Sequence, residues 1–167
     1  MVHICNLSFT TGVFPYELKI ANVVPIFKSG DERVFSNYRP VSVLPVFSKL
    51  LERLMYNRLL QYINDNNLLY NLQFGFQKGK STHMAIIVLL DKISEALDNG
   101  DYVIGVFLDF SKAFDTVDHC ILLRKLEKYG VCDTYLKWFE DYLSNRAQYV
   151  TYNSIKSFHE SINCGVP

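Results

Sequence analysis

The segment Val103–Val117, with the sequence VIGVFLDFSKAFDTV, contains the side chain best suited to chemistry, Asp109. The residues that lead to it, Asp101–Asp109, are apolar on both faces of an extended chain, and this pattern predicts a strand buried in a sheet. An aspartate that ends such a strand stands at the rim of the sheet, where carboxylates commonly bind metal ions or accept phosphoryl groups. The plainer alternative is an aspartate that only caps the following turn.

Two functional interpretations of Asp109 stay open on spacing alone. In the first, its carboxylate binds Mg²⁺ for phosphoryl transfer, because Mg²⁺ prefers oxygen ligands and substrate phosphates. A two-metal site would then need further acids from elsewhere in the chain. In the second, Asp109 is the phospho-acceptor of a receiver-like domain. Such a domain needs repeated parallel β-α units, and the long helices predicted before this strand argue against it.

A second candidate is Gly75–Thr82, whose sequence GFQKGKST nearly matches a phosphate-binding P-loop. Only three residues separate its glycines, whereas the P-loop pattern has four. We therefore expect a turn and then a helix capped by Ser81 or Thr82, not a nucleotide triphosphatase. Lys78 and Lys80 could contact the phosphate backbone of a nucleic acid.

Two further groups of polar residues have simple structural explanations. Lys28 and Arg39 flank a predicted hairpin tip and could reach a triphosphate, although most such side chains are solvated surface charges. Asp115, Asp118 and His119 form a D-x-x-D-H cluster with the look of a metal site. We expect Asp118 to cap a helix instead, which accounts for the spacing.

The order of apolar periodicity and turn signals predicts a mixture of helices and strands, so the expected fold class is α+β. Helices are expected within residues 1–21 before a turn near residue 12, over 47–64, from 81 or 82 to 98, from 118 to 130, and from a cap at Asp133 to 143. Strands are expected over 21–27, 101–109, 148–152 and 158–164, with a turn at 28–31 and an extended stretch over 40–45.

The composition, with 49% apolar and 20% charged residues, is typical of a globular protein. The formal net charge is zero, but residues 1–80 hold nine Lys and Arg against five Asp and Glu, and residues 81–167 hold eight against twelve. A basic half could contact a phosphate backbone. Scattered cysteines argue against zinc, and the longest apolar run, Met84–Leu90, is too short to cross a bilayer. We expect a soluble, intracellular protein that does not enter a membrane.

Four segments, in this order, carry a resemblance to one family: FPYELKIANVVPIFKSGD, NYRPVSVLPVFSKLLERLMYNRL, QFGFQKGKST and FLDFSKAFDTVDH, with CGVP at the end. From about Asn6 to Pro167 the chain resembles the reverse transcriptase domain of non-LTR (LINE-like) retrotransposons. The resemblance implies a right-hand RNA-directed DNA polymerase that uses Mg²⁺, an RNA template, a DNA primer and deoxynucleotides. Residues from about 1 to 100 would form fingers, and residues from about 101 to 167 the first part of the palm.

The same resemblance assigns roles to single residues. Asp109 matches the first catalytic aspartate, a Mg²⁺ ligand, and the backbone carbonyl of Phe110 would also face the metal. Phe114 matches the steric gate that excludes a 2′-hydroxyl, and Lys28 and Arg39 match residues that clamp the triphosphate. Contacts with template or nucleotide are expected at Gln73, Gly75, Lys78, Lys80, Ser81 and Thr82. Within that element Gln77 replaces the family's usual Arg, which removes a charge and a bidentate donor.

The second part of the family's metal site is an Asp-Asp pair on a later hairpin, and this sequence contains no Asp-Asp dipeptide. Gly165, Val166 and Pro167 match only the opening of the element that comes before it. We therefore expect a fragment, truncated before the catalytic hairpin, that does not polymerise DNA by itself. The alternative is a non-catalytic nucleic-acid-binding or interaction module derived from a decayed retroelement.

Overall fold

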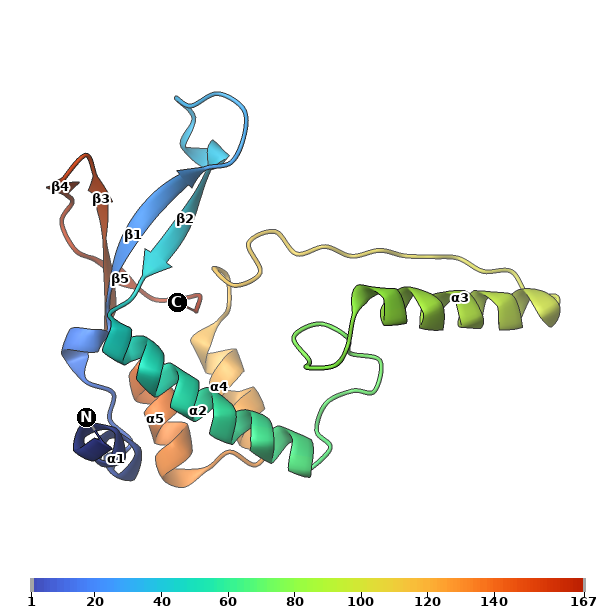
Figure 1. Cartoon of the computed structure of the whole chain (residues 1–167), viewed down its shortest axis with the longest axis horizontal. Coiled ribbons are helices and arrows are strands. Elements are labelled where there is room, and N and C mark those ends of the chain that lie inside the picture. The colour runs from blue at the N-terminus through green and yellow to red at the C-terminus, as the bar shows by residue number, and fades with distance from the viewer. Residues whose placement is uncertain (1, 167) are drawn as a thin grey trace. The chain divides into compact units, whose positions relative to one another are not determined.

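A computed structural model describes residues 2–166, which form an α+β fold divided into two compact units. One unit joins the chain up to Asn57 with the chain from Lys112 onward, and the other is Arg58–Ser111. The helices are α1 (Val2–Thr11), α2 (Val46–Asp65), α3 (Thr82–Asp98), α4 (His119–Lys128) and α5 (Asp133–Leu143). The strands are β1 (Ile20–Phe27), β2 (Tyr38–Val43), β3 (Arg146–Tyr152), β4 (Ile155–Lys156) and β5 (Glu160–Ile162), and the 3-10 helices are η1 (Tyr16–Leu18) and η2 (Phe35–Asn37) (Figure 1). The expected α+β class is confirmed.

The strands form one mixed sheet in the first unit, in the order β2-β1-β3-β4, with β5 also paired to β3 (Figure 1). β1 and β2 make an antiparallel hairpin, whereas β1 and β3 run parallel, with Ile20 opposite Ala147. Pro25 lies opposite Pro40 and beyond the part of β1 that pairs with β3. Because β3 does not pair with β1 at this position, the N–H that proline lacks is not needed for a hydrogen bond to β3, and the strand tolerates the proline.

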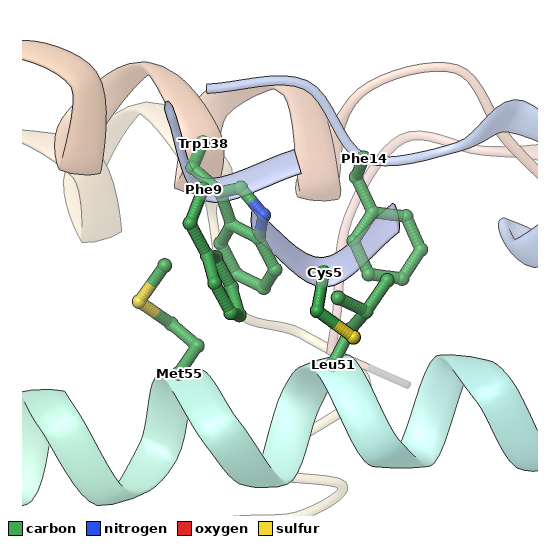
Figure 2. Close-up of a cluster of buried hydrophobic side chains, with 6 residues drawn as sticks. All are labelled: Cys5, Phe9, Phe14, Leu51, Met55 and Trp138. Carbon is green, nitrogen blue, oxygen red and sulfur yellow. The ribbon is translucent and has the colours of Figure 1, made fainter. Parts of the chain in front are cut away.

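The core of this unit lies where α1, α2 and α5 meet. Its buried apolar side chains are Cys5, Phe9, Phe14, Leu51, Met55 and Trp138 (Figure 2). The Trp138 ring packs edge-on against Phe14 at 5.4 Å between ring centroids, and its Nε1–H donates to Ser8 Oγ at 3.0 Å. Aromatic side chains thus contribute large buried areas here, and the indole N–H that would otherwise be unsatisfied has a partner.

Two buried cations join the helices to the sheet. Lys19, just before β1, pairs with Asp141 on α5 at 3.1 Å between Nζ and Oδ2. Arg146 begins β3, donates from Nη1 to Tyr142 O at 3.0 Å and lies over the Tyr142 ring. Desolvation lowers the pKa of Arg146, while desolvation and then the Glu52 carboxylate raise the pKa of Tyr142. Charged groups therefore take part in the packing between α2, α5 and β3.

Most helix starts agree with the sequence predictions. Ser81 Oγ accepts a hydrogen bond from Met84 N–H at 3.2 Å, and Asp118 Oδ1 accepts one from Ile121 N–H at 2.8 Å, so both predicted caps are confirmed. The predicted cap at Asp133 is wrong. Cys132 takes the N-cap position of α5, and Asp133 becomes the first helical residue, with φ at +51°. Its carboxylate accepts from the Cys132 thiol at 3.4 Å and so does not cap the helix.

The predicted buried strand Asp101–Asp109 is also wrong in this structure. The segment has no regular secondary structure and is exposed, with Tyr102 99% and Leu108 83% accessible. A strand needs a neighbour for its backbone hydrogen bonds, and the described strands pair only with one another. The apolar pattern indicates that this segment would be stable when buried, but none of the described residues covers it. The helix next to it, α3, likewise has no buried residue.

Candidate functional site

The β1–β2 hairpin positions Lys28 and Arg39, the two residues expected to clamp a triphosphate. Arg39 lies opposite Ile26 in the antiparallel ladder, and Lys28 follows the last residue of β1. Lys28 lies beyond the strand, where its backbone N–H still bonds across the hairpin to Asn37 O. Both cations are exposed. The two cations therefore flank the tip of one hairpin, as the sequence predicted.

The loop at the tip of this hairpin is held by hydrogen bonds around Asn37. Lys28 N–H donates to Asn37 O at 2.9 Å, and Asn37 Nδ2 donates to Asp31 O at 2.9 Å. Gly30 has φ at +96°, and a Cβ added there would lie 2.7 Å from Asn37 Nδ2. Residue 30 therefore favours glycine for its backbone angle, and a side chain there would also displace the Asn37 amide from its bond with Asp31 O.

The second candidate loop precedes α3 in the other unit. Gln77 donates from Nε2 to Gln73 O at 2.9 Å and so closes the turn. Lys80 Nζ lies 5.2 Å from the centre of the Phe74 ring, within the range of a cation–π contact. The remaining candidates of this loop, Gly75, Lys78, Ser81 and Thr82, are exposed. The geometry is that of a turn and a capped helix, with no P-loop cradle.

Asp109 and Phe110, the proposed metal ligands, follow the irregular segment in the same unit. Both are exposed. Within residues 2–166 no three His, Cys, Asp or Glu side chains lie close enough together to hold a metal ion. The Asp109 carboxylate and the Phe110 carbonyl are oxygen ligands of the kind Mg²⁺ takes, but the described residues do not assemble a complete two-metal site around them.

Phe114 lies in a loop, residues 112–118, which the end of the chain contacts through its backbone. Gly165 N–H donates to Val117 O at 2.8 Å, and Val166 N–H donates to Phe114 O at 2.9 Å. The His119 ring also contacts the Gly165 carbonyl, with 2.7 Å between Nε2 and O. Sequence reasoning missed this contact, because it explained the Asp115–His119 cluster by helix capping alone. The residues that meet are 46 positions apart, and no local spacing signals such a pair.

The expected site residues are therefore divided between the two units. Lys28, Arg39 and Phe114 belong to the first unit, and the loop before α3 belongs to the second together with Asp109 and Phe110. The contacts above hold the hairpin tip, the 112–118 loop and the loop before α3, whereas Asp109 and Phe110 lie in an exposed segment without regular structure. In the described part of the chain, no helix is long and apolar enough to cross a membrane.

Comparison with known proteins identifies the family. Residues 26–167 match the family model described as reverse transcriptase (RNA-dependent DNA polymerase). The chain belongs to the reverse transcriptase family, and its domain is related to those of non-LTR retrotransposons. The resemblance inferred from the four sequence segments is confirmed.

The relatives are encoded by insect mobile elements. The RNA-directed DNA polymerase from mobile element jockey of Drosophila melanogaster is 34% identical over 98% of this chain, which spans 18% of that protein. The probable RNA-directed DNA polymerase from transposon BS of the same species is 38% identical over 80% of this chain and 16% of its own length. The Pol polyprotein from retrotransposable element R2DM is 30% identical over 87% of this chain. The chain thus spans less than a fifth of the length of these relatives.

Proposed function

We propose that this chain is the fingers and the first part of the palm of an RNA-directed DNA polymerase of a non-LTR retrotransposon. The observation that carries the proposal is the family match over residues 26–167, which includes Asp109 and Phe114 in their expected order. The reaction of the whole enzyme would be attack of a primer 3′-hydroxyl on the α-phosphate of a deoxynucleotide. Fingers would comprise about residues 1–100, and the palm segment about residues 101–167.

The nucleotide would be held by residues of the hairpin and of the 112–118 loop. Lys28 and Arg39 flank the tip of the β1–β2 hairpin, both exposed, and two cations so placed could bind a triphosphate. Phe114, 58% exposed, presents an aromatic ring that would pack under the sugar and leave no room for a 2′-hydroxyl. This group would therefore both bind the deoxynucleotide and select it.

The template would be contacted by the loop before α3. Lys78 and Lys80 can neutralise phosphates, and Gln73, Gly75, Ser81 and Thr82 lie in the turn and the helix start beside them. The replacement of the family's Arg by Gln77 leaves a neutral side chain that is used to close the turn. Contacts with the RNA template in this loop would therefore depend on the two lysines.

Asp109 and the Phe110 carbonyl would be the ligands that this chain gives to Mg²⁺. When bound, the ions of a two-metal site activate the attacking hydroxyl and stabilise the leaving pyrophosphate. One carboxylate does not position two ions about 3.5–4 Å apart. We therefore propose that the 167-residue chain alone does not extend a primer, whatever protein it is part of.

The proposal is tested by primer extension on an RNA template, with a longer polymerase that contains this chain. Asp109→Ala should abolish extension, whereas the matched change Asp101→Ala, at an exposed acid of the same segment, should leave it near wild type. Lys28→Ala should raise KM for deoxynucleotides more than Arg33→Ala in the same hairpin. Equal activity of Asp109→Ala and Asp101→Ala would refute the metal assignment, and a wild-type protein that binds template without extending the primer would favour a non-catalytic binding module.

A further inference from the structure

We infer that His119 is a positioning residue, which binds the turn at Gly165 and thereby fixes the position of Phe114. Through Phe114 it would influence the discrimination between deoxy- and ribonucleotides. The inference rests on the proposed function, since it concerns the sugar gate of that same site. Neither the matches to known proteins nor the sequence pattern gives His119 a role. Its contact with Gly165, across 46 residues, is what singles it out.

The Gly165 turn is joined to the 112–118 loop by two backbone hydrogen bonds and to the first residue of α4 by a third. Val166 N–H donates to the carbonyl of Phe114 itself, at 2.9 Å, and Gly165 N–H donates to Val117 O at 2.8 Å. The third bond joins His119 Nε2 and Gly165 O at 2.7 Å. A carbonyl oxygen has no proton to donate, so Nε2 must carry the hydrogen in this contact. The carbonyl of the gate residue and the backbone that follows it are thus tied to one turn.

Gly165 is the residue that lets the two segments come so close. Its φ is +82°, and a Cβ added there would lie 2.8 Å from Asp115 O and 3.0 Å from Asp115 Cα. These are backbone atoms, which cannot move aside as a flexible side chain can. Gly165 is buried, so its carbonyl depends on a protein donor such as His119 in place of water.

His119 is well placed to supply that donor because its own backbone is fixed. It is the first residue of α4, and the preceding Asp118 caps this helix through Ile121 N–H at 2.8 Å. The imidazole then reaches Gly165 O from a helix that is already anchored. The Phe114 ring is 58% exposed, and its own carbonyl accepts the bond from Val166 N–H, so the bonds of the turn act directly on the backbone that carries the ring.

The structural test is amide hydrogen exchange on the 167-residue chain, read by NMR at Gly165 and Val166. His119→Leu should raise exchange at both amides about tenfold, the effect of losing one hydrogen bond that helps to keep the turn closed. His119→Gln, whose amide can place a donor near the position of Nε2, should restore most of the protection. Amide groups of α5 serve as the internal reference and should not change. Unchanged exchange at Gly165 and Val166 in His119→Leu would overturn the inference.

The functional test is the ratio of kcat/KM for ribo- and deoxynucleotides in a longer polymerase that contains this chain. His119→Leu should raise the relative use of ribonucleotides, His119→Gln should return it toward wild type, and Phe114→Val should raise it most. A loss of stability alone would lower both rates and leave the ratio unchanged. If Phe114→Val shifts the ratio and His119→Leu does not, the positioning role is wrong. If Phe114→Val itself has no effect, the proposed gate is wrong, and the exchange data still decide whether His119 holds the turn.

Discussion

The ion pair between Lys19 and Asp141 should be a main determinant of how firmly α5 is attached to the sheet. The Lys19 side chain is 4% exposed and that of Asp141 is 31% exposed, with 3.1 Å between Nζ and Oδ2. The same Oδ2 accepts a hydrogen bond from Phe14 N–H at 2.6 Å. Removal of the carboxylate therefore leaves a buried ammonium without its ion-pair partner, and a change at residue 141 should cost more than a surface pair would.

The expected cost follows from the groups that each variant leaves unpaired. Asp141→Asn keeps an oxygen for Phe14 N–H but removes the negative charge, and we expect about 2–3 kcal/mol of lost stability, the lower part of the range for a broken buried pair because Asp141 is partly exposed. Asp141→Ala also removes the Phe14 bond and should cost about 1 kcal/mol more. Lys19→Met retains the apolar stem without a charge, and should cost about 1 kcal/mol or less.

The measurement is urea unfolding followed by the fluorescence of Trp138. It is the single tryptophan of the chain, and it is buried beside Phe14. The double variant Lys19→Met with Asp141→Asn should be more stable than Asp141→Asn alone, because the unpaired cation is gone. A cost below about 0.5 kcal/mol for Asp141→Asn, with no coupling in the double variant, would show that water solvates Lys19 and would refute the reasoning.

Three further predictions concern the proposed polymerase. Phe114→Val in a longer polymerase should raise the incorporation ratio of ribo- to deoxynucleotides, and an unchanged ratio would remove Phe114 from the gate role. The 167-residue chain should bind RNA or primer–template weakly, with an affinity that falls at least about tenfold between 50 and 200 mM salt, and Lys28→Glu with Arg39→Glu should flatten that slope in a fluorescence titration. The chain alone should give no primer extension with Mg²⁺ or Mn²⁺; extension that Asp109→Ala abolishes would mean that other acids complete the metal site.

The sequence predicted those elements whose signals are local. The helix expected over 47–64 and the caps at Ser81 and Asp118 rest on signals within a few residues of the helices they define, and all three agree with the structure. The cap at Asp133 failed because serine, aspartate and related residues can also form other short hydrogen bonds, and here the carboxylate meets the neighbouring Cys132. Local sequence signals thus predict where a helix begins, but not always which residue is the N-cap.

The contacts that order the candidate site are long-range, and these could not be read from the pattern. The parallel pairing of β1 with β3 joins segments more than a hundred residues apart, and it places Lys19 and Arg146 in the interior at adjacent strand starts. From the sequence alone, Lys19 and Arg146 would be expected on the surface because they are charged. Only the fold shows that Asp141 pairs with Lys19 and that the Tyr142 ring contacts Arg146.

The two residues that would do most in the reaction are held in very different ways. Phe114 lies in a loop whose backbone accepts hydrogen bonds at the Phe114 and Val117 carbonyls. The loop and the turn at Gly165 approach so closely that a side chain at residue 165 would not fit between them. Asp109 ends an exposed, irregular segment whose apolar residues have the pattern of a buried strand. A carboxylate must be held within a fraction of an ångström to ligate a metal well, whereas a steric gate needs only a fixed backbone. Under the proposed function, sugar selection would be the part of the chemistry that these residues can set by themselves, and metal binding would depend on further contacts of the irregular segment before Asp109.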